Sequence, residues 1–129
     1  MLAAPHRLRH SAEFTSVLRG RRSRRAGSRL LVVHATLRTA ELSQDSAAPL
    51  PARVGFVVSK AVGNAVVRNR TKRILRHQMA ARLQTLPAGT DVVVRANPGA
   101  AGRSSSVLGA ELDRLLPRVV RTADEPGAR

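Results

Sequence analysis

The stretch "GFVVSKAVGNAVVRNRTKRILRH", residues 55–77, decides how the chain folds. With the two residues before it, its first part places Val54, Phe56 and Val58 on one face of an extended chain, which predicts a β-strand over 53–59. Asn64 is a favourable N-cap, and apolar residues recur at helical spacing after it. The stretch therefore predicts a strand, a short connection and a helix.

The predicted helix has one apolar face and one cationic face. At about 100° per residue, the apolar arc contains Val67, Thr71, Ile74, Leu75 and Gln78. The opposite arc contains Arg68, Asn69, Lys72, Arg73 and Arg76, with Arg70 at its flank. A solvated helix face usually mixes both signs of charge, because i,i+4 ion pairs stabilise it. This face has no acidic residue, so we expect it to bind anions.

Charge extends well beyond this helix. The 129 residues carry a formal net charge of +15, and acidic residues are absent from 14–40 and from 46–90. A basic chain of this kind repels itself unless a polyanion binds, and among anionic partners we favour nucleic acid over a membrane surface. The chain has two phenylalanines and no tyrosine or tryptophan, which argues against a sheet that stacks RNA bases on several aromatic rings.

Composition excludes several other classes of protein. The absence of cysteine excludes a disulfide framework and a zinc finger. No apolar run approaches the roughly 20 residues of a membrane span, and the N-terminus lacks the apolar region of a secretory signal. We therefore expect one domain in the cytoplasm, without a membrane partner.

Working outward, residues 1–10 look like a flexible basic arm, and 122–129 like a disordered tail, so the folded domain is expected over 11–121. Ser11 is a candidate N-cap for a short helix over 12–19. The arginine-rich segment 21–28 fits a phosphate-contacting loop or a short edge strand equally well.

The remaining elements complete a two-layer pattern. Strands are expected over 29–38 and 90–96, with a loop over 39–52, and a last helix begins near Val107. Serines before Val107 can cap that helix, and Pro117 should kink or end it unless it lies near the terminus. The order helix, strands, helix, strand, helix predicts a single-domain two-layer α/β sandwich.

Catalytic chemistry is poorly represented. The eight acidic residues are scattered, and Glu111 and Asp113 fall on different sides of a helix, so no carboxylate cluster for metal-dependent nuclease chemistry can be assigned. The four histidines have no metal-ligand spacing. The chain by itself looks like a binding protein.

The stretch 55–77 closely resembles the signature of the protein subunit of bacterial ribonuclease P, with the RNR core at Arg68, Asn69 and Arg70. The resemblance extends from Arg7 to about Val120. It implies a four-stranded sheet and a left-handed connection from the 53–59 strand through the basic helix to the 90–96 strand. Parallel connections are otherwise almost always right-handed.

The resemblance also implies a function. Such a subunit assists a catalytic RNA that removes the 5′ leader of precursor tRNA by endonucleolytic cleavage. The RNA carries the active site and its Mg²⁺ ions, so the protein contributes no catalytic residue and holds no tight metal. The expected partners are the catalytic RNA and precursor tRNA, with no obligate protein partner.

Site residues follow from the same resemblance. The residues expected to contact RNA are Lys60, Gly63, Asn64, Arg68, Asn69, Arg70, Lys72, Arg73 and Arg76. Those expected to line a leader cleft between the first helix and the sheet are Phe14, Leu18, Val32, His34, Val57 and Ser59. The chain departs from the family at Ala61, where a second lysine is common, and at Leu18 and His34, where aromatic residues are common.

Two other interpretations account for part of the pattern. A generic RNA-binding structural protein, similar to a ribosomal protein, explains the charge but not the run from Val62 to Arg76. A metal-dependent nuclease acting alone is opposed by the scattered acids.

Overall fold

The computed structural model describes residues 6–8, 14, 17–18, 23–37 and 51–120. In chain order, the strands and helices of the described part are β1 (Arg24–Gly27), β2 (Leu31–Leu37), β3 (Arg53–Val58), α3 (Ala65–Ala80), β4 (Thr90–Ala96) and α4 (Ser105–Val119). Short 3-10 turns lie at Lys60–Val62, Leu83–Thr85 and Pro98–Ala100.

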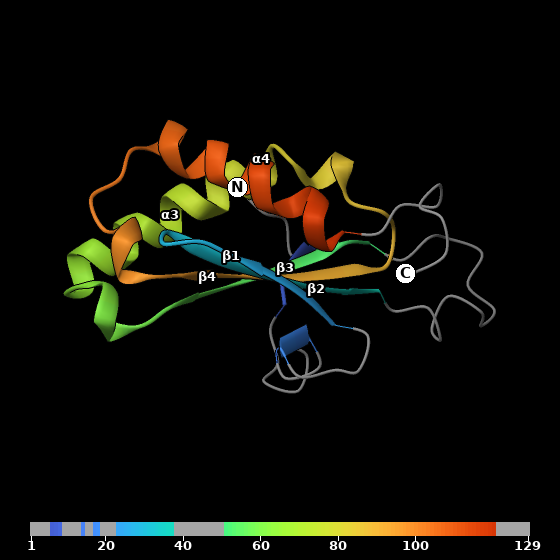
Figure 1. Ribbon diagram of the computed structural model, residues 1–129, viewed down its shortest axis with the longest axis horizontal. Helices are drawn as coiled ribbons and strands as arrows, with labels where there is room; N and C mark the ends of the chain where they lie inside the picture. Colours follow the sequence, from blue (N-terminus) through green and yellow to red (C-terminus); the bar gives the residue numbers. More distant parts are fainter. Residues whose placement is uncertain (1–5, 9–13, 15–16, 19–22, 38–50, 121–129) are drawn as a thin grey trace.

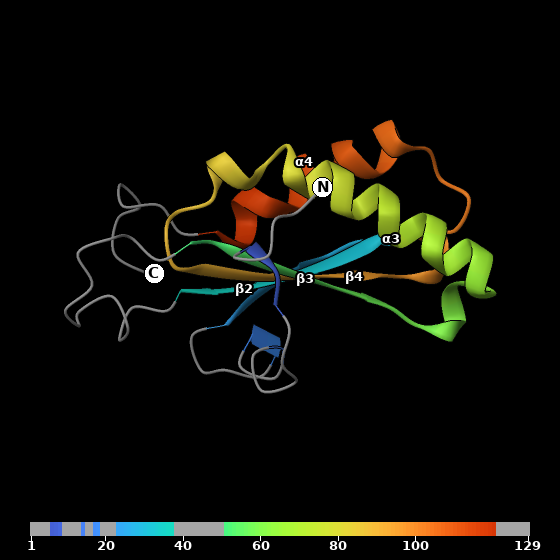
Figure 2. The same cartoon turned by 180° about the vertical axis from the view of Figure 1, so that it is seen from behind.

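The strands form one four-stranded sheet in the order β1-β2-β4-β3. β2 is antiparallel to both β1 and β4, whereas β3 is parallel to β4. Helices α3 and α4 cover one face, and the first helical segment lies on the other (Figure 1). In Figure 1, β3 and β4 both run from right to left beneath the helices, and β3 lies behind β4. Because the chain passes from β3 over the sheet through α3 and returns in front as β4, the connection is left-handed. Figure 2 gives the reverse view. The handedness expected from the resemblance is therefore present.

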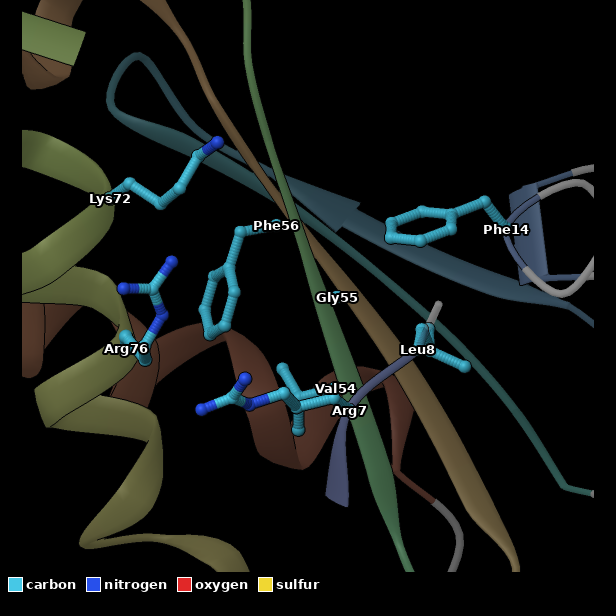
Figure 3. Close-up of a pocket in the computed structure, with 8 residues that line it drawn as sticks. All are labelled: Arg7, Leu8, Phe14, Val54, Gly55, Phe56, Lys72 and Arg76. Atoms are coloured by element: carbon cyan, nitrogen blue, oxygen red, sulfur yellow. The ribbon is translucent and has the colours of Figure 1, made fainter. Parts of the chain in front are cut away.

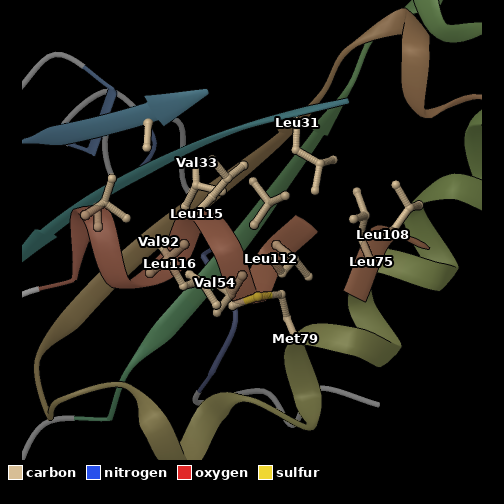
Figure 4. Close-up of a cluster of buried hydrophobic side chains, with 14 of the residues drawn as sticks. Leu31, Val33, Val54, Leu75, Met79, Val92, Leu108, Leu112, Leu115 and Leu116 are labelled. Atoms are coloured by element: carbon tan, nitrogen blue, oxygen red, sulfur yellow. The ribbon is translucent and has the colours of Figure 1, made fainter. Parts of the chain in front are cut away.

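The main core lies between the sheet and the two helices (Figure 4). Leu31 and Val33 from β2 meet Leu75 and Met79 of α3, together with leucines of α4, and all of them are buried. Burying one such aliphatic side chain stabilises a fold by about 1.5–3 kcal/mol. This layer fixes the apolar face of α3 against the sheet and leaves its cationic face outside.

A polar clamp joins the end of α3 to α4. The guanidinium of Arg82 donates to both carboxylate oxygens of Asp113, at 2.7 and 2.9 Å, and to the backbone carbonyl of Gly109 at 3.1 Å. Gly109 is buried, and a Cβ there would lie 2.6 Å from the side-chain oxygen of Gln78. The hydrogen bonds from Arg82 hold the pKa of Asp113 below its usual value. The clamp sets how closely the two helices approach.

The helix ends agree with the sequence. Asn64 caps α3 by accepting a hydrogen bond from the backbone N–H of Val67 at 3.0 Å, and Ser104 caps α4 in the same way through Val107 at 3.2 Å. Pro117 lies in the last turn of α4, which ends two residues later, so it does not kink the body of the helix.

Several expectations are corrected. The segment 21–28 was expected to be either a phosphate-contacting loop or a short edge strand. Its residues Arg24–Gly27 form the edge strand β1. The strand expected over 29–38 begins at Leu31, because Ser28 turns the chain by donating its backbone N–H to the carbonyl of Leu31 at 2.8 Å. The strand expected over 53–59 ends at Val58.

The first ten residues include a segment that belongs to the fold. Arg7 pairs with Val54 in a parallel bridge, and the Leu8 N–H donates to the Val54 carbonyl at 3.1 Å. The Leu8 side chain is buried. The flexible basic arm expected over 1–10 is therefore wrong for Arg7 and Leu8, because their backbone pairs with the edge strand β3. The expected tail at 122–129, the loop over 39–50 and most of the first helix lie outside the described residues.

Candidate nucleic-acid interface

The cationic face of α3 is where the sequence placed it. Asn69, Arg70 and Arg73 are exposed, and Arg68, Lys72 and Arg76 are half-buried. None of these six side chains has an ion pair or hydrogen bond with another described residue, and α3 contains no acidic residue. A row of unpaired cations on a rigid helix can neutralise several phosphates of one polyanion.

Arg68 differs from its neighbours on this face. Its Nε lies buried and has no hydrogen-bond partner among the described residues. Leaving a buried donor unpaired is costly, so an acceptor supplied from outside the chain would be favourable there. Arg68 is half-buried, whereas Arg70 and Arg73 are exposed.

The turn before α3 depends on Gly63. Its φ of 156° and ψ of −167° fall in a region that only glycine readily occupies. A Cβ on Gly63 would also lie 2.9 Å from the Val67 side chain. Gly63 is thus explained by the backbone, which brings the cap Asn64 into position, while Lys60 and Asn64 are exposed at the same end of the helix.

A second candidate surface lies on the opposite face of the sheet. Phe14, Leu18 and Val57 pack around an apolar cluster of Leu8, Val17 and Val93. The Phe14 ring covers Gly55, where a Cβ would overlap it. All three described residues of the first helix, Phe14, Val17 and Leu18, are helical, as expected. Phe14 and Leu18 are half-buried, so part of each side chain remains accessible.

His34 and Val32 extend this face toward β1. His34 pairs across the sheet with Arg25 on one side and Val93 on the other, and Val32 pairs with Arg95. Burial lowers the pKa of His34, and the charges of Arg25 and Arg95 lower it further. Burial and the neighbouring arginines therefore favour the neutral form of the His34 imidazole. Ser59, the remaining residue expected in the cleft, is exposed beyond the end of β3 and is not part of the apolar cluster.

Sequence reasoning missed four residues of these surfaces. Arg25 and Arg95 flank His34, and strand alternation could have placed Arg95 on the same face as Val93. Arg7 and Phe56 line a pocket at the β3 edge together with Lys72 and Arg76 (Figure 3). Nothing in the local sequence signals this pocket, because its walls come from four separate segments.

Other kinds of site find no support in the described residues. No group of three or more His, Cys, Asp or Glu side chains within 6–8, 14, 17–18, 23–37 and 51–120 could hold a metal ion. None of the described helices has the length and hydropathy needed to cross a bilayer.

Known proteins resemble this chain over nearly its whole length. The sequence profile of the family Ribonuclease P matches residues 2–120. The chain belongs to the ribonuclease P protein family. A Ribonuclease P protein component from Nocardioides sp. is 50% identical over 119 residues, which are 92% of this chain and 95% of that protein. The Ribonuclease P protein component of Acidothermus cellulolyticus is 46% identical over 127 residues, or 98% of each chain.

Solved structures share the fold. The RNase P protein of Staphylococcus aureus superposes with a TM-score of 0.72 at 24% identity, covering 90% of this chain and 98% of that one. The RNase P protein of Thermotoga maritima gives 0.69 at 22% identity, covering 89% and 98%. The resemblance found in residues 55–77 is thus confirmed. The chain is the protein component of a ribonucleoprotein endonuclease that acts in tRNA processing.

Proposed function

We propose that this chain binds the catalytic RNA of ribonuclease P through the cationic face of α3. The observation that carries the proposal is the set of cations on that face that no described residue pairs. Arginine forks suit bidentate contacts to phosphate, and the helix holds them at fixed spacing. The buried Nε of Arg68 adds a donor that an RNA oxygen could satisfy. The generic ribosomal-like alternative gives no reason for this arrangement.

The opposite face is the proposed contact for the 5′ leader of precursor tRNA. Phe14 is held on Gly55 and is half-buried, so one part of the ring packs and another remains accessible. Base stacking on an aromatic ring contributes about 1–3 kcal/mol per base. His34 and Leu18 stand where the family commonly has aromatics, which makes Phe14 the main stacking group of this cleft.

Hydrolysis is assigned to the RNA. Scattered acids and histidines supply no donor set for Mg²⁺ in the described part of the protein, so the ions that the holoenzyme requires are proposed to bind the RNA. The protein's contribution is to bind and position the two RNA partners. We expect it to act in the cytoplasm with no obligate protein partner.

The affinity of the protein for its catalytic RNA, measured at several salt concentrations, tests this function. Arg70→Ala and Arg73→Ala should each weaken binding and reduce the log–log salt slope by nearly one, with little change in melting temperature, because both side chains are exposed. Arg118→Ala, an exposed arginine on α4, is the matched control and should leave the slope unchanged. Equal effects in all three variants would oppose an RNA-binding face on α3.

A further inference from the structure

A pocket with a volume of about 180 Å³ opens at the edge of the sheet beside β3 (Figure 3). Its walls come from the N-terminal segment, the first helix, β3 and α3. The lining residues are Arg7, Leu8, Phe14, Val54, Gly55, Phe56, Lys72 and Arg76. Neither the predicted RNA contacts of α3 nor the predicted leader cleft includes Arg7 or Phe56.

The pocket combines an apolar floor with a cationic rim. The Phe56 ring points from β3 toward α3, with Lys72 and Arg76 beside it, and Arg7 approaches from below (Figure 3). Three of the eight lining residues are cations and none is acidic. Lys72 and Arg76 have no ion pair or hydrogen bond with another described residue. Positive charge gathered around an accessible aromatic ring suits a ligand with one flat ring and one negative group.

The pocket also joins the two proposed RNA-binding surfaces, which lie on opposite faces of the sheet. Phe14 belongs to the face proposed to contact the leader, whereas Lys72 and Arg76 belong to the cationic face of α3. All three residues nevertheless line the same pocket. This is possible because β3 is the edge strand, so no further strand separates the faces. The Arg7–Val54 bridge covers the edge at one end of β3 and forms one wall of the pocket.

We propose that this pocket binds one nucleotide of single-stranded RNA, with the base against Phe56 and the phosphate between Lys72 and Arg76. The inference rests on the proposed function, in that the protein must bind RNA. A cavity of similar volume in another protein holds one benzene ring, so the space suits one base and excludes a duplex. The nucleotide comes either from the leader or from an unpaired segment of the catalytic RNA, and the chemistry of recognition is the same.

A double-mutant cycle tests the proposal. Phe56→Leu keeps apolar bulk but removes the ring, and should weaken RNA binding at least about fivefold. Arg76→Gln removes the charge at the rim. If one nucleotide contacts both side chains, the fold-loss of RNA affinity in the double variant should be smaller than the product of the two single fold-losses. The difference should be at least about threefold. The control pair is Phe56→Leu with Arg73→Gln, since Arg73 is an exposed cation of the same helix outside the pocket.

Two arms of the experiment separate the sources of the nucleotide. The first measures binding of each variant to the catalytic RNA alone, and the second measures binding of the reconstituted holoenzyme to precursor tRNA relative to mature tRNA. Coupling in the first arm assigns the nucleotide to the catalytic RNA, and coupling in the second assigns it to the leader.

The control pair should be additive within about twofold in both arms. Additivity of Phe56→Leu with Arg76→Gln in both arms overturns the pocket while leaving RNA binding by α3 intact. If the unmodified protein fails to bind the catalytic RNA, the proposed function itself fails. Lys72→Ala in place of Arg76→Gln repeats the cycle without altering Arg76, and melting temperatures identify any variant that is merely unfolded.

Discussion

At the scale of single residues, Phe14 packs against the sheet and is also the proposed stacking group for the leader. Its ring lies on Gly55 and against the apolar cluster of Leu8, Val17 and Val93. The Phe14 side chain is nevertheless only half-buried. Phe14→Leu preserves much of the apolar contact but loses most of the stacking contribution, about 1–3 kcal/mol per base. We expect the variant holoenzyme to bind precursor tRNA several-fold more weakly, as measured by equilibrium binding.

Mature tRNA is the matched control for Phe14→Leu, because it has no leader, and its affinity should barely change. Equal weakening of both substrates, or a large drop in melting temperature with no loss of leader affinity, would show that Phe14 serves only to pack the first helix.

His34 gives a prediction for pH. Burial and the charges of Arg25 and Arg95 lower its pKa in the folded protein, whereas an unfolded histidine titrates near 6.5. Below that pH the unfolded chain binds more protons than the folded one, so the free energy of unfolding should decrease as the pH falls through 6.5 toward the folded pKa. Above that range the contribution is fully present.

Denaturant unfolding between pH 7.5 and 5 measures this contribution. His34→Gln should make the unfolding free energy depend less on pH, whereas His77→Gln, which removes an exposed histidine of α3, should retain the dependence. An identical pH dependence in the protein and in His34→Gln would contradict the assignment.

At the scale of elements, the presentation of the cationic helix depends on its first turn. The Asn64 side chain accepts from the Val67 N–H, and Gly63 positions it. Removing an N-cap oxygen typically costs about 1 kcal/mol. Asn64→Ala should therefore lower the unfolding free energy by roughly that amount, whereas Asn64→Ser, which keeps an acceptor, should lie close to the original protein. Thermal unfolding distinguishes them, and equal destabilisation by both would mean that the cap is not what Asn64 supplies.

Sequence patterns predicted the elements better than their contacts. Alternation in 53–59 assigned Val54 and Phe56 to one face of β3, and the structure packs both toward α3. Helical spacing identified Leu75 but not Met79, which is fully buried at the end of the same face. Periodicity reports which face is apolar, but not where the apolar stripe ends, because that depends on what packs against it.

Contacts between distant segments had no local signal. The pairing of Arg7 with Val54 joins residues 47 positions apart, and only the assembled sheet makes β3 an edge that Arg7 can bridge. Likewise, Arg53 and Asp91 form an ion pair at 2.8 Å. The pair exists because β3 and β4 are parallel neighbours whose register places Arg53 opposite Asp91. The residues that face RNA remain predictions from the sequence. For the six polar residues of the cationic face of α3 they are supported by side chains that make no ion pair or hydrogen bond with another described residue.

At the scale of the whole molecule, the chain carries a net charge of +15, and its described part places candidate binding surfaces on both faces of the sheet. The cationic face of α3 lies on the helical side, and the Phe14 surface lies beneath the sheet. Under the proposed function the protein contacts precursor tRNA and the catalytic RNA at once, and we expect its effect on cleavage to come from holding the two together.

The cleavage of precursor tRNA at low Mg²⁺ concentration tests this account most directly. Three reactions are compared: the protein alone, the matching catalytic RNA alone, and the two together. The account predicts no mature 5′ end from the protein alone, slow cleavage by the RNA alone, and much faster cleavage by the complex at the same site. Specific cleavage by the protein alone that is lost on changing one of its acidic residues, or no stimulation of the catalytic RNA, would contradict it.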